Sequence, residues 1–126
     1  QLDALGHEVD EVHPPGLADG SVIGHFLTGF GAWTAHQLDR IGELLGAPVT
    51  PEGVEAGTWA VAEMGRSITA PQYLAALDGL HAFARALTSW WEVDGYDLLL
   101  TPTVPEVPPT LGQFAATPEE PLAGLL

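Results

Sequence analysis

The sequence lacks cysteine and lysine, and its only basic side chains belong to Arg40, Arg66 and Arg85. Without cysteine, the chain can form neither a disulfide framework nor a thiolate metal site, which fits a reducing interior. Its 17 acidic residues outnumber the three arginines and give a formal net charge of −14. Because nucleic acids and anionic membranes are both bound through many basic side chains, we expect neither as a partner.

Long apolar runs are missing as well. No stretch approaches the roughly 20 apolar residues of a membrane-spanning helix, and no signal peptide begins at Gln1. Hydrophobic residues nevertheless make up 46% of the 126 residues, which is enough for the core of one domain. We therefore expect the chain to come from a soluble, cytoplasmic protein.

Three stretches have apolar residues at steps of three and four, the period of one helix face. They predict helices at approximately Val22–Leu45, Pro51–Met64 and Ala70–Val93. Thr69 and Gln72 are spaced as a capping box at the start of the third helix. We expect the first and third helices to pack as an antiparallel pair, with the short helix between them. The seam of the third helix is expected to be Tyr73, Leu77, Leu80, Ala84, Leu87 and Trp91.

The first predicted helix contains three glycines in its middle part. Each of Gly24, Gly29 and Gly31 weakens a helix by about 1 kcal/mol relative to alanine. We therefore expect a bend or a close helix crossing where another element approaches this backbone.

Two segments outside the helices predict short strands. Polar and apolar residues roughly alternate from His7 to Val12, and Tyr96 begins a run that reaches Leu100. The continuous apolar run before Pro102 is typical of a strand that is covered on both faces. Such a strand needs a sheet, yet the chain offers one weak partner strand. The sequence therefore indicates a piece of a larger fold.

Three stretches in register resemble the amidase signature family, in particular its branch of cyclic-dimer nylon-oligomer hydrolases and related bacterial amidases. They are LDALGHEVDEVHPP at residues 2–15, GTWAVAEMGRSITAPQYLAALDGLHAFAR at 57–85, and GYDLLLTPT at 95–103 followed by PPTLG at 108–112. The resemblance covers nearly the whole chain in the family's order. It implies a mainly α-helical segment of the α/β amidase fold, with one or two short strands.

The resemblance divides the chain, taken as one partial amidase domain over residues 1–126, into three parts. Residues 1–15 are expected to hold a helix end, a strand and a Pro-Pro loop, residues 16–95 the helical region, and residues 96–126 a strand and a proline-rich loop. Gly6 is expected to cap the last turn of a helix that starts before Gln1. We therefore expect an internal fragment of an amidase.

The family cleaves amide bonds with a serine nucleophile, a second serine and a lysine base, and this apparatus is not found here. There is no lysine, and Ser21, Ser67 and Ser89 do not lie in the Gly-Ser-Ser-rich setting of the family. No catalytic residue is carried over, so we expect the chain alone to be inactive. We expect no cofactor and no metal, because His7-Glu8 has no second histidine at the spacing of a zinc protease motif.

Four residues are candidates for contact with a small-molecule amide substrate in the full-length enzyme. Trp33 and Trp59 could wall its apolar entrance, although aromatic residues at these helix positions are more often core residues. Thr101 and Thr103 follow a predicted strand, where loops often face ligands, although a threonine beside proline is more often a turn residue. His25, His36 and His81 are expected to be surface or groove residues.

The oligomeric state is predicted from the apolar surface that a fragment exposes. In a fragment, the Leu98–Leu100 run and parts of the helix faces would be exposed to solvent, so we expect the fragment to form a homo-oligomer. The alternative function is a free-standing helical module that dimerises or binds a partner through its helix seam.

Overall fold

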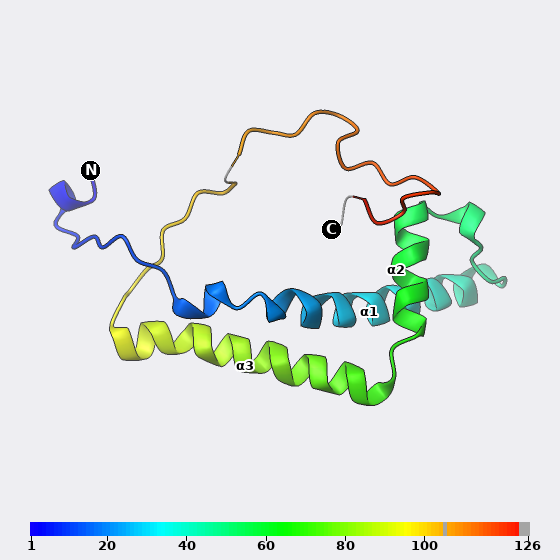
Figure 1. Cartoon of the computed structure of the whole chain (residues 1–126), viewed down its shortest axis with the longest axis horizontal. Helices are drawn as coiled ribbons and strands as arrows, with labels where there is room; N and C mark the ends of the chain where they lie inside the picture. The colour runs from blue at the N-terminus through cyan, green and yellow to red at the C-terminus, as the bar shows by residue number, and fades with distance from the viewer. Residues whose placement is uncertain (105, 124–126) are drawn as a thin grey trace.

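The computed structural model describes residues 1–104 and 106–123 and contains three α-helices in this part of the chain. They are α1 (Ser21–Leu45), α2 (Ala56–Arg66) and α3 (Ala70–Asp94). Single 3₁₀ turns form at Asp3–Leu5, Pro15–Ala18 and Pro51–Gly53. Figure 1 shows α3 running alongside α1 in the opposite direction, while α2 crosses α1. The prediction of a mainly helical segment with an antiparallel pair is confirmed.

The ends of α1 and α3 follow from local chemistry. The Ser21 backbone N–H donates to the Asp19 carboxylate at 3.0 Å, which satisfies a free donor at the start of α1. At the start of α3 the predicted capping box is present: the Thr69 N–H donates to Gln72 Oε1 at 2.8 Å, and the Gln72 N–H donates to Thr69 Oγ1 at 3.5 Å. The predicted ranges of both helices are confirmed within a residue.

The start of the second helix differs from the prediction. The Thr50-Pro51 pair begins a 3₁₀ turn, and α2 starts five residues later than expected, at Ala56. Val54 interrupts the helix because its backbone is extended, with φ −141° and ψ 166°. This conformation lets the Val54 side chain pack against the buried cluster of Ala35, Leu38 and Ala62, and tertiary packing overrides the local start signal.

The close helix crossing expected in the middle of α1 is confirmed at one of its three glycines. A methyl group on Gly31 would lie 3.1 Å from Met64 Cε and 3.3 Å from the Gly65 backbone, whereas Gly24 and Gly29 have no such neighbours within 4 Å. A methyl group on Gly65 would overlap the Gly31 carbonyl. Two glycines therefore let the backbones of α1 and α2 touch.

The seam between α1 and α3 is rotated from the predicted one. Ala76 and Trp90 are buried, whereas Tyr73 is 37% exposed and Ala84 is exposed. The most inward face has alternating steps of four and three, and consists of Ala76, Leu80, Phe83, Leu87 and Trp90, while Leu77 and Trp91 of the predicted seam stay half-buried. The half-buried His25 ring of α1 occupies the space where Gly79 would carry a side chain, so the two helices meet closely there.

The two predicted strands are absent from the described part of the chain. Residues 7–12 and 96–104 are extended or irregular, but neither segment has a ladder partner. Leu98 and Leu100 are 83% and 80% exposed. The prediction of a strand covered on both faces is therefore not met in this part of the chain, because hydrogen-bonded strands form only when a partner strand is present.

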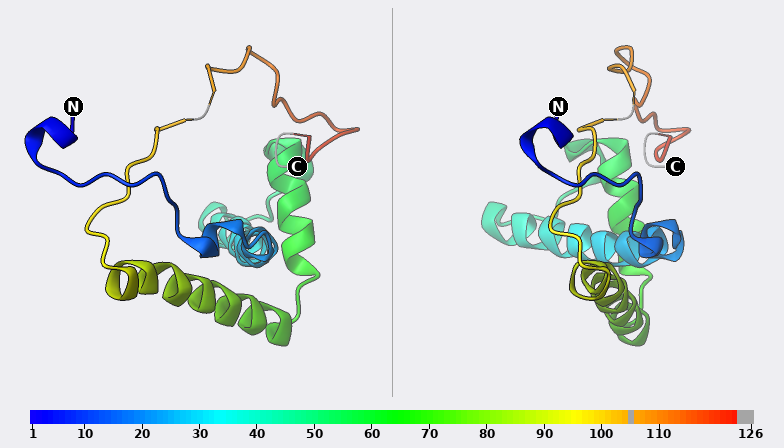
Figure 2. Two further views of the ribbon diagram at one scale, coloured as in Figure 1. Left: turned by 60° about the vertical axis from the view of Figure 1, so that its left-hand side comes forward. Right: turned by 90° about the vertical axis from the view of Figure 1, so that its left-hand side faces the viewer.

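The terminal segments leave the helices on one side, opposite α3 (Figure 2). The N-terminal segment first packs against the end of α3, where Pro14 is fully buried and Gly16 lies beside Ala86. Gly6 has a left-handed φ of 90° after the Asp3–Leu5 turn, as expected for a C-terminal cap. Within residues 1–104 and 106–123, no helix is both long enough and apolar enough to span a bilayer.

Candidate functional site

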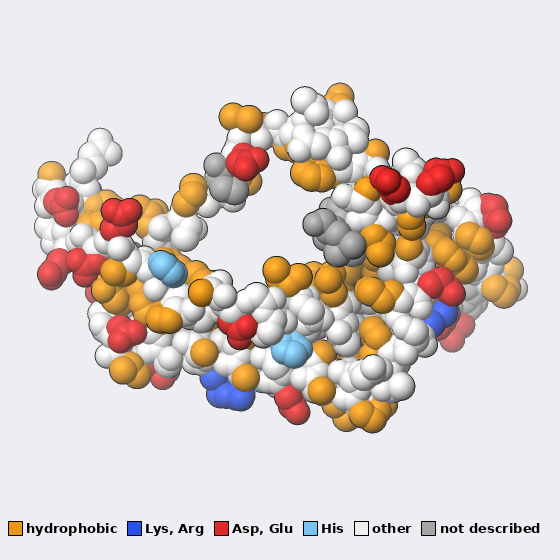
Figure 3. Space-filling model, viewed as in Figure 1, with side chains coloured by type: hydrophobic (Ala, Val, Ile, Leu, Met, Phe, Trp, Pro, Cys, Tyr) orange, Lys and Arg blue, Asp and Glu red, His pale blue; other side chains and the backbone are white. Residues whose placement is uncertain are grey.

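A hollow of about 390 Å³ lies between α1, the start of α2 and the C-terminal segment. We call it the Trp33 hollow. Most of its lining is apolar or aromatic, and its residues are Phe30, Trp33, Thr34, Glu55, Gly57, Thr58, Val61, Phe114, Ala116, Pro121 and Leu122. Figure 3 shows hydrophobic side chains along α1 and α2 below the arch of the C-terminal segment. The volume falls within the range of small-molecule sites, and the hollow is open to solvent on one side.

Three aromatic side chains of α1 form a stacked row beside this hollow. The ring centroids of Phe26 and Phe30 are 5.7 Å apart and the rings lie within 9° of parallel. Phe30 and Trp33 are stacked in the same way, with centroids 6.2 Å apart and an angle of 19°. Steps of four and three residues place all three on one helix face. Trp33 is still 57% exposed, so much of its ring is open to a ligand.

The opposite wall is the C-terminal strap, residues 110–123, which contains two turns. In the first turn, the Thr110 N–H donates to Gln113 Oε1 at 3.3 Å and the Gln113 N–H donates to the Thr110 carbonyl at 3.1 Å. In the second turn, the Glu120 N–H donates to Thr117 Oγ1 at 3.0 Å. These bonds fix the two turns, and Pro121 and Leu122 are the half-buried residues of the strap.

Gly57 is the point at which the strap meets α2. A methyl group there would lie 3.0 Å from the Pro121 carbonyl oxygen and 3.4 Å from Ala116 Cβ. The first of these distances is too short for an ordinary contact with backbone. The absence of a side chain at Gly57 therefore allows the strap to close this side of the hollow.

Few polar groups face the hollow. The Thr34 hydroxyl donates to the Phe30 carbonyl at 2.8 Å, so its proton is already engaged within α1. The Glu55 carboxylate precedes α2 and makes no capping hydrogen bond with it. None of the lining residues is basic. The hollow therefore combines aromatic surfaces with one carboxylate and the Thr58 hydroxyl.

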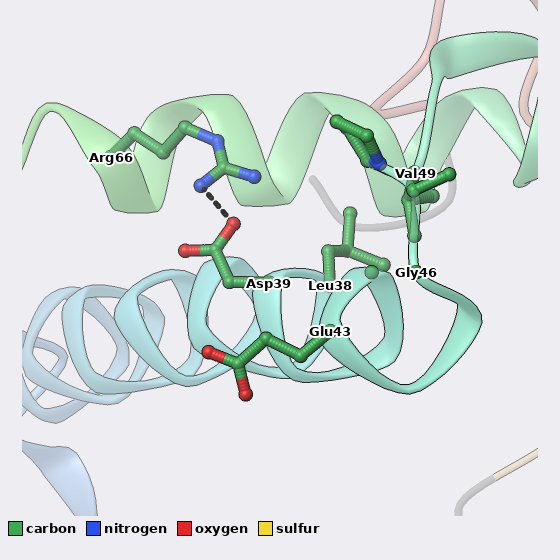
Figure 4. Close-up of a pocket in the computed structure, with 9 residues that line it drawn as sticks. Leu38, Asp39, Glu43, Gly46, Val49 and Arg66 are labelled. Carbon is green, nitrogen blue, oxygen red and sulfur yellow. Dashed lines mark hydrogen bonds and ion pairs between the residues drawn. The ribbon is translucent and has the colours of Figure 1, made fainter.

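A second hollow, of about 400 Å³, lies where the ends of α1 and α2 meet (Figure 4). Arg66 Nη1 is 2.9 Å from Asp39 Oδ1, and Arg66 Nε is 3.2 Å from Glu63 Oε1. Glu43 points away from Arg66 (Figure 4) and lies 3.8 Å from Arg40 Nε. Because the guanidinium of Arg66 is already held by two carboxylates, we regard this hollow as a structural ion-pair site.

A polar contact joins the segment after α3 to the N-terminal segment. The Tyr96 ring stacks on Trp90 with centroids 4.3 Å apart, and its hydroxyl donates to Asp10 Oδ2 at 3.3 Å. Desolvation and the negative charge of Asp10 raise the pKa of Tyr96 above its usual 10.0. In the described residues, no group of three or more histidines and acids is placed to hold a metal ion.

The four residues singled out from the sequence lie in three different environments. Trp33 lines the Trp33 hollow, whereas Trp59 is half-buried and packs against the core of Ala35, Leu38 and Ala62. Thr101 and Thr103 are exposed on the segment after α3 and line neither hollow. The structure does not bring these four residues together.

Sequence reasoning missed Glu55 and Phe114. The four- and three-residue spacing of the aromatic row could have indicated Phe30 together with Trp33. No local pattern could have indicated Phe114, because it reaches the hollow only through the fold of the strap.

The chain is similar to two bacterial enzymes called 6-aminohexanoate-cyclic-dimer hydrolase. It is 35% identical over 113 residues to the enzyme of Pseudomonas sp. (strain NK87) and 34% identical over 113 residues to that of Paenarthrobacter ureafaciens. Each match covers 90% of this chain and 23% of the enzyme. A solved structure of 6-aminohexanoate cyclic dimer hydrolase complexed with substrate matches 96% of this chain, with 31% identity and a TM-score of 0.89. No family model matches the chain.

The chain spans about a quarter of the length of these relatives, 23% of the enzymes and 26% of the solved chain. The likeness extends over almost all of its own residues, including the helices that carry the Trp33 hollow. These matches confirm the resemblance that the three sequence stretches indicated. The chain is therefore homologous to one segment of the 6-aminohexanoate-cyclic-dimer hydrolases, enzymes of the amidase signature family.

Proposed function

We propose that this chain is the part of an amide-hydrolysing enzyme that forms one apolar wall of the substrate cleft, and that it is inactive by itself. The observation that best supports this is the match of 96% of the chain to about a quarter of a related hydrolase. An open, largely apolar hollow on these helices suits a wall that contacts the aliphatic part of an amide.

In this proposal Trp33 contacts the substrate. Thr101 and Thr103 face the cleft only when the rest of the enzyme covers the segment after α3, and Trp59 supports the wall from the core side. Catalysis comes from other parts of the enzyme, since this chain has no lysine base. The cytoplasmic location expected from the composition stays a prediction.

A chimera tests this function. The homologous segment of a 6-aminohexanoate-cyclic-dimer hydrolase is replaced by this chain, and hydrolysis of the cyclic dimer is measured. We expect an active chimera in which Trp33→Ala raises KM more than it lowers kcat, because the ring contributes binding and not chemistry. Trp33→Phe, which keeps an aromatic face, serves as the matched control. A folded chimera without activity, or a Trp33→Ala variant with unchanged KM, contradicts the proposal.

The alternative, an independent interaction module, draws support from exposed apolar side chains. Leu98 and Leu100 are open to solvent, and Ile23 and Phe26 are more than half exposed on α1. In that function the chain alone binds a partner through these surfaces. A chimera that folds but is inactive, together with a stable dimer of the isolated chain, favours this alternative.

A further inference from the structure

The walls of the Trp33 hollow are aromatic on two sides. Trp33 and Phe30 stack on α1, and Phe114 comes from the C-terminal strap. Trp33 and Phe114 remain 57% and 60% exposed although both line the hollow. The face of an aromatic ring carries negative potential, so open rings attract a cation as well as an aliphatic chain.

Glu55 supplies the only charged side chain of this lining. Two of the three arginines are engaged with other acids: Arg66 pairs with Asp39 and Glu63, and Arg40 pairs with Glu43. Arg85 is on α3 and does not line the hollow. Within the described residues, no ion pair neutralises the Glu55 carboxylate, and the net charge of the chain is −14.

We propose that the Trp33 hollow binds an aliphatic chain that carries an ammonium group, with the alkyl part on the rings and the ammonium directed to Glu55. A carboxylate end is disfavoured, because the full negative charge of Glu55 and the negative faces of the rings outweigh the partial positive charge at the start of α2. The amides accepted in this cleft are then those with neutral or cationic chain ends. This last step, from ligand to substrate, rests on the proposed function, whereas the binding itself does not.

Three probes of equal chain length test the charge preference on the isolated 126-residue chain. They are n-hexylammonium, hexanamide and hexanoate, titrated while tryptophan fluorescence and ligand NMR are recorded. Ligands of this size bind with Kd values in the millimolar range at best. We expect n-hexylammonium to bind about tenfold more tightly than hexanoate, with hexanamide between them. Equal or tighter binding of hexanoate, or no binding of any probe, overturns the proposal.

Two matched variants distinguish an effect of the Glu55 carboxylate from an effect of the net charge of the chain. Glu55→Gln is expected to weaken n-hexylammonium about threefold and to change hexanamide binding less than twofold. Glu52→Gln removes an acid from the same segment between α1 and α2, but outside the hollow, and is expected to change the binding of neither probe. Equal effects of the two substitutions would show that only net charge matters. Trp33→Leu should weaken n-hexylammonium and hexanamide alike, and circular dichroism checks that each variant remains helical.

The outcomes of this titration and of the chimera are independent. An inactive chimera with normal n-hexylammonium binding removes the proposed function and leaves the site. An active chimera without charge discrimination keeps the function and removes the ammonium site.

Discussion

Replacing Gly65 by alanine should destabilise the protein although alanine is the better helix former. The added methyl group would overlap the Gly31 carbonyl and lie 2.8 Å from the Ala32 nitrogen. All of these neighbours are backbone atoms of α1, which cannot rotate away as a side chain can. The helices must therefore separate at their crossing, which also disturbs the buried Ala62 and Val61 nearby on α2.

Two opposing effects set the change in the free energy of unfolding. Overpacking of a tight site destabilises by about 3 kcal/mol at the upper end of the usual range, while Gly→Ala in a helix stabilises by about 1 kcal/mol. The expected net loss is about 2 kcal/mol, which corresponds to a fall in Tm of about 8 °C for a domain of this size. Gly31→Ala should cost less, because one of its close neighbours is the flexible end of Met64.

Gly24→Ala is the matched control. It lies on the same helix as Gly31 and has no neighbour within 4 Å, so it should stabilise the protein by about 0.5–1 kcal/mol. Urea unfolding followed by circular dichroism gives the free energy of unfolding for each variant. If Gly65→Ala proves as stable as Gly24→Ala, α1 and α2 do not meet at these glycines and the packing described here is wrong.

Three further predictions concern titration and assembly. Asp10→Asn should lower the pKa of Tyr96 toward 10.0 without reaching it, since desolvation is the larger cause, and tyrosinate absorbance in a Tyr73→Phe background measures this. Because the folded pKa is raised, the contribution of Tyr96 to stability is present below pH 10 and is lost as the pH rises through the higher folded value. The hydrogen bonds from Ser21 lower the pKa of Asp19 in the folded protein. The contribution of Asp19 to stability is therefore present above pH 3.8 and is lost as the pH falls through its pKa in the folded state. Asp19→Ala should lower Tm at neutral pH and leave Tm unchanged in stronger acid. Light scattering at tens of micromolar protein should detect oligomers, and a clean monomer would contradict the inference drawn from the exposed Leu98 and Leu100.

The sequence predicted the features that depend on neighbouring residues. The ranges of α1 and α3, the capping box at Thr69 and the close approach at Gly31 all follow from spacings within a few turns of helix. The late start of α2 was missed because Val54 packs on a core that no local pattern reveals. The rotated face of α3 was missed for a similar reason, since the close contact of His25 with Gly79 joins two helices and leaves no local pattern.

The predicted strands and the site residues depend on contacts between distant parts of the chain, which the sequence does not specify locally. An apolar run such as Leu98–Leu100 reports that a segment is expected to be covered, but it does not supply the pairing partner. Of the four candidate site residues, Trp33 was placed in a hollow, and its companions Phe114 and Glu55 come from other parts of the chain. A hollow built by three separate segments has only a partial signature in any one of them, and in α1 this is the row of Phe26, Phe30 and Trp33.

The contact of the strap with Gly57 has a consequence for the order of folding. Contacts of α1 with α2 and of the capping box within α3 join residues that are near in sequence, and closing short loops is fast and costs little entropy. The strap must return from Pro121 to reach Gly57, so its closure fixes a longer loop than the contacts between α1 and α2 and follows them. The helices therefore assemble around an open hollow, and the wall that carries Phe114 is added to a framework that has already formed.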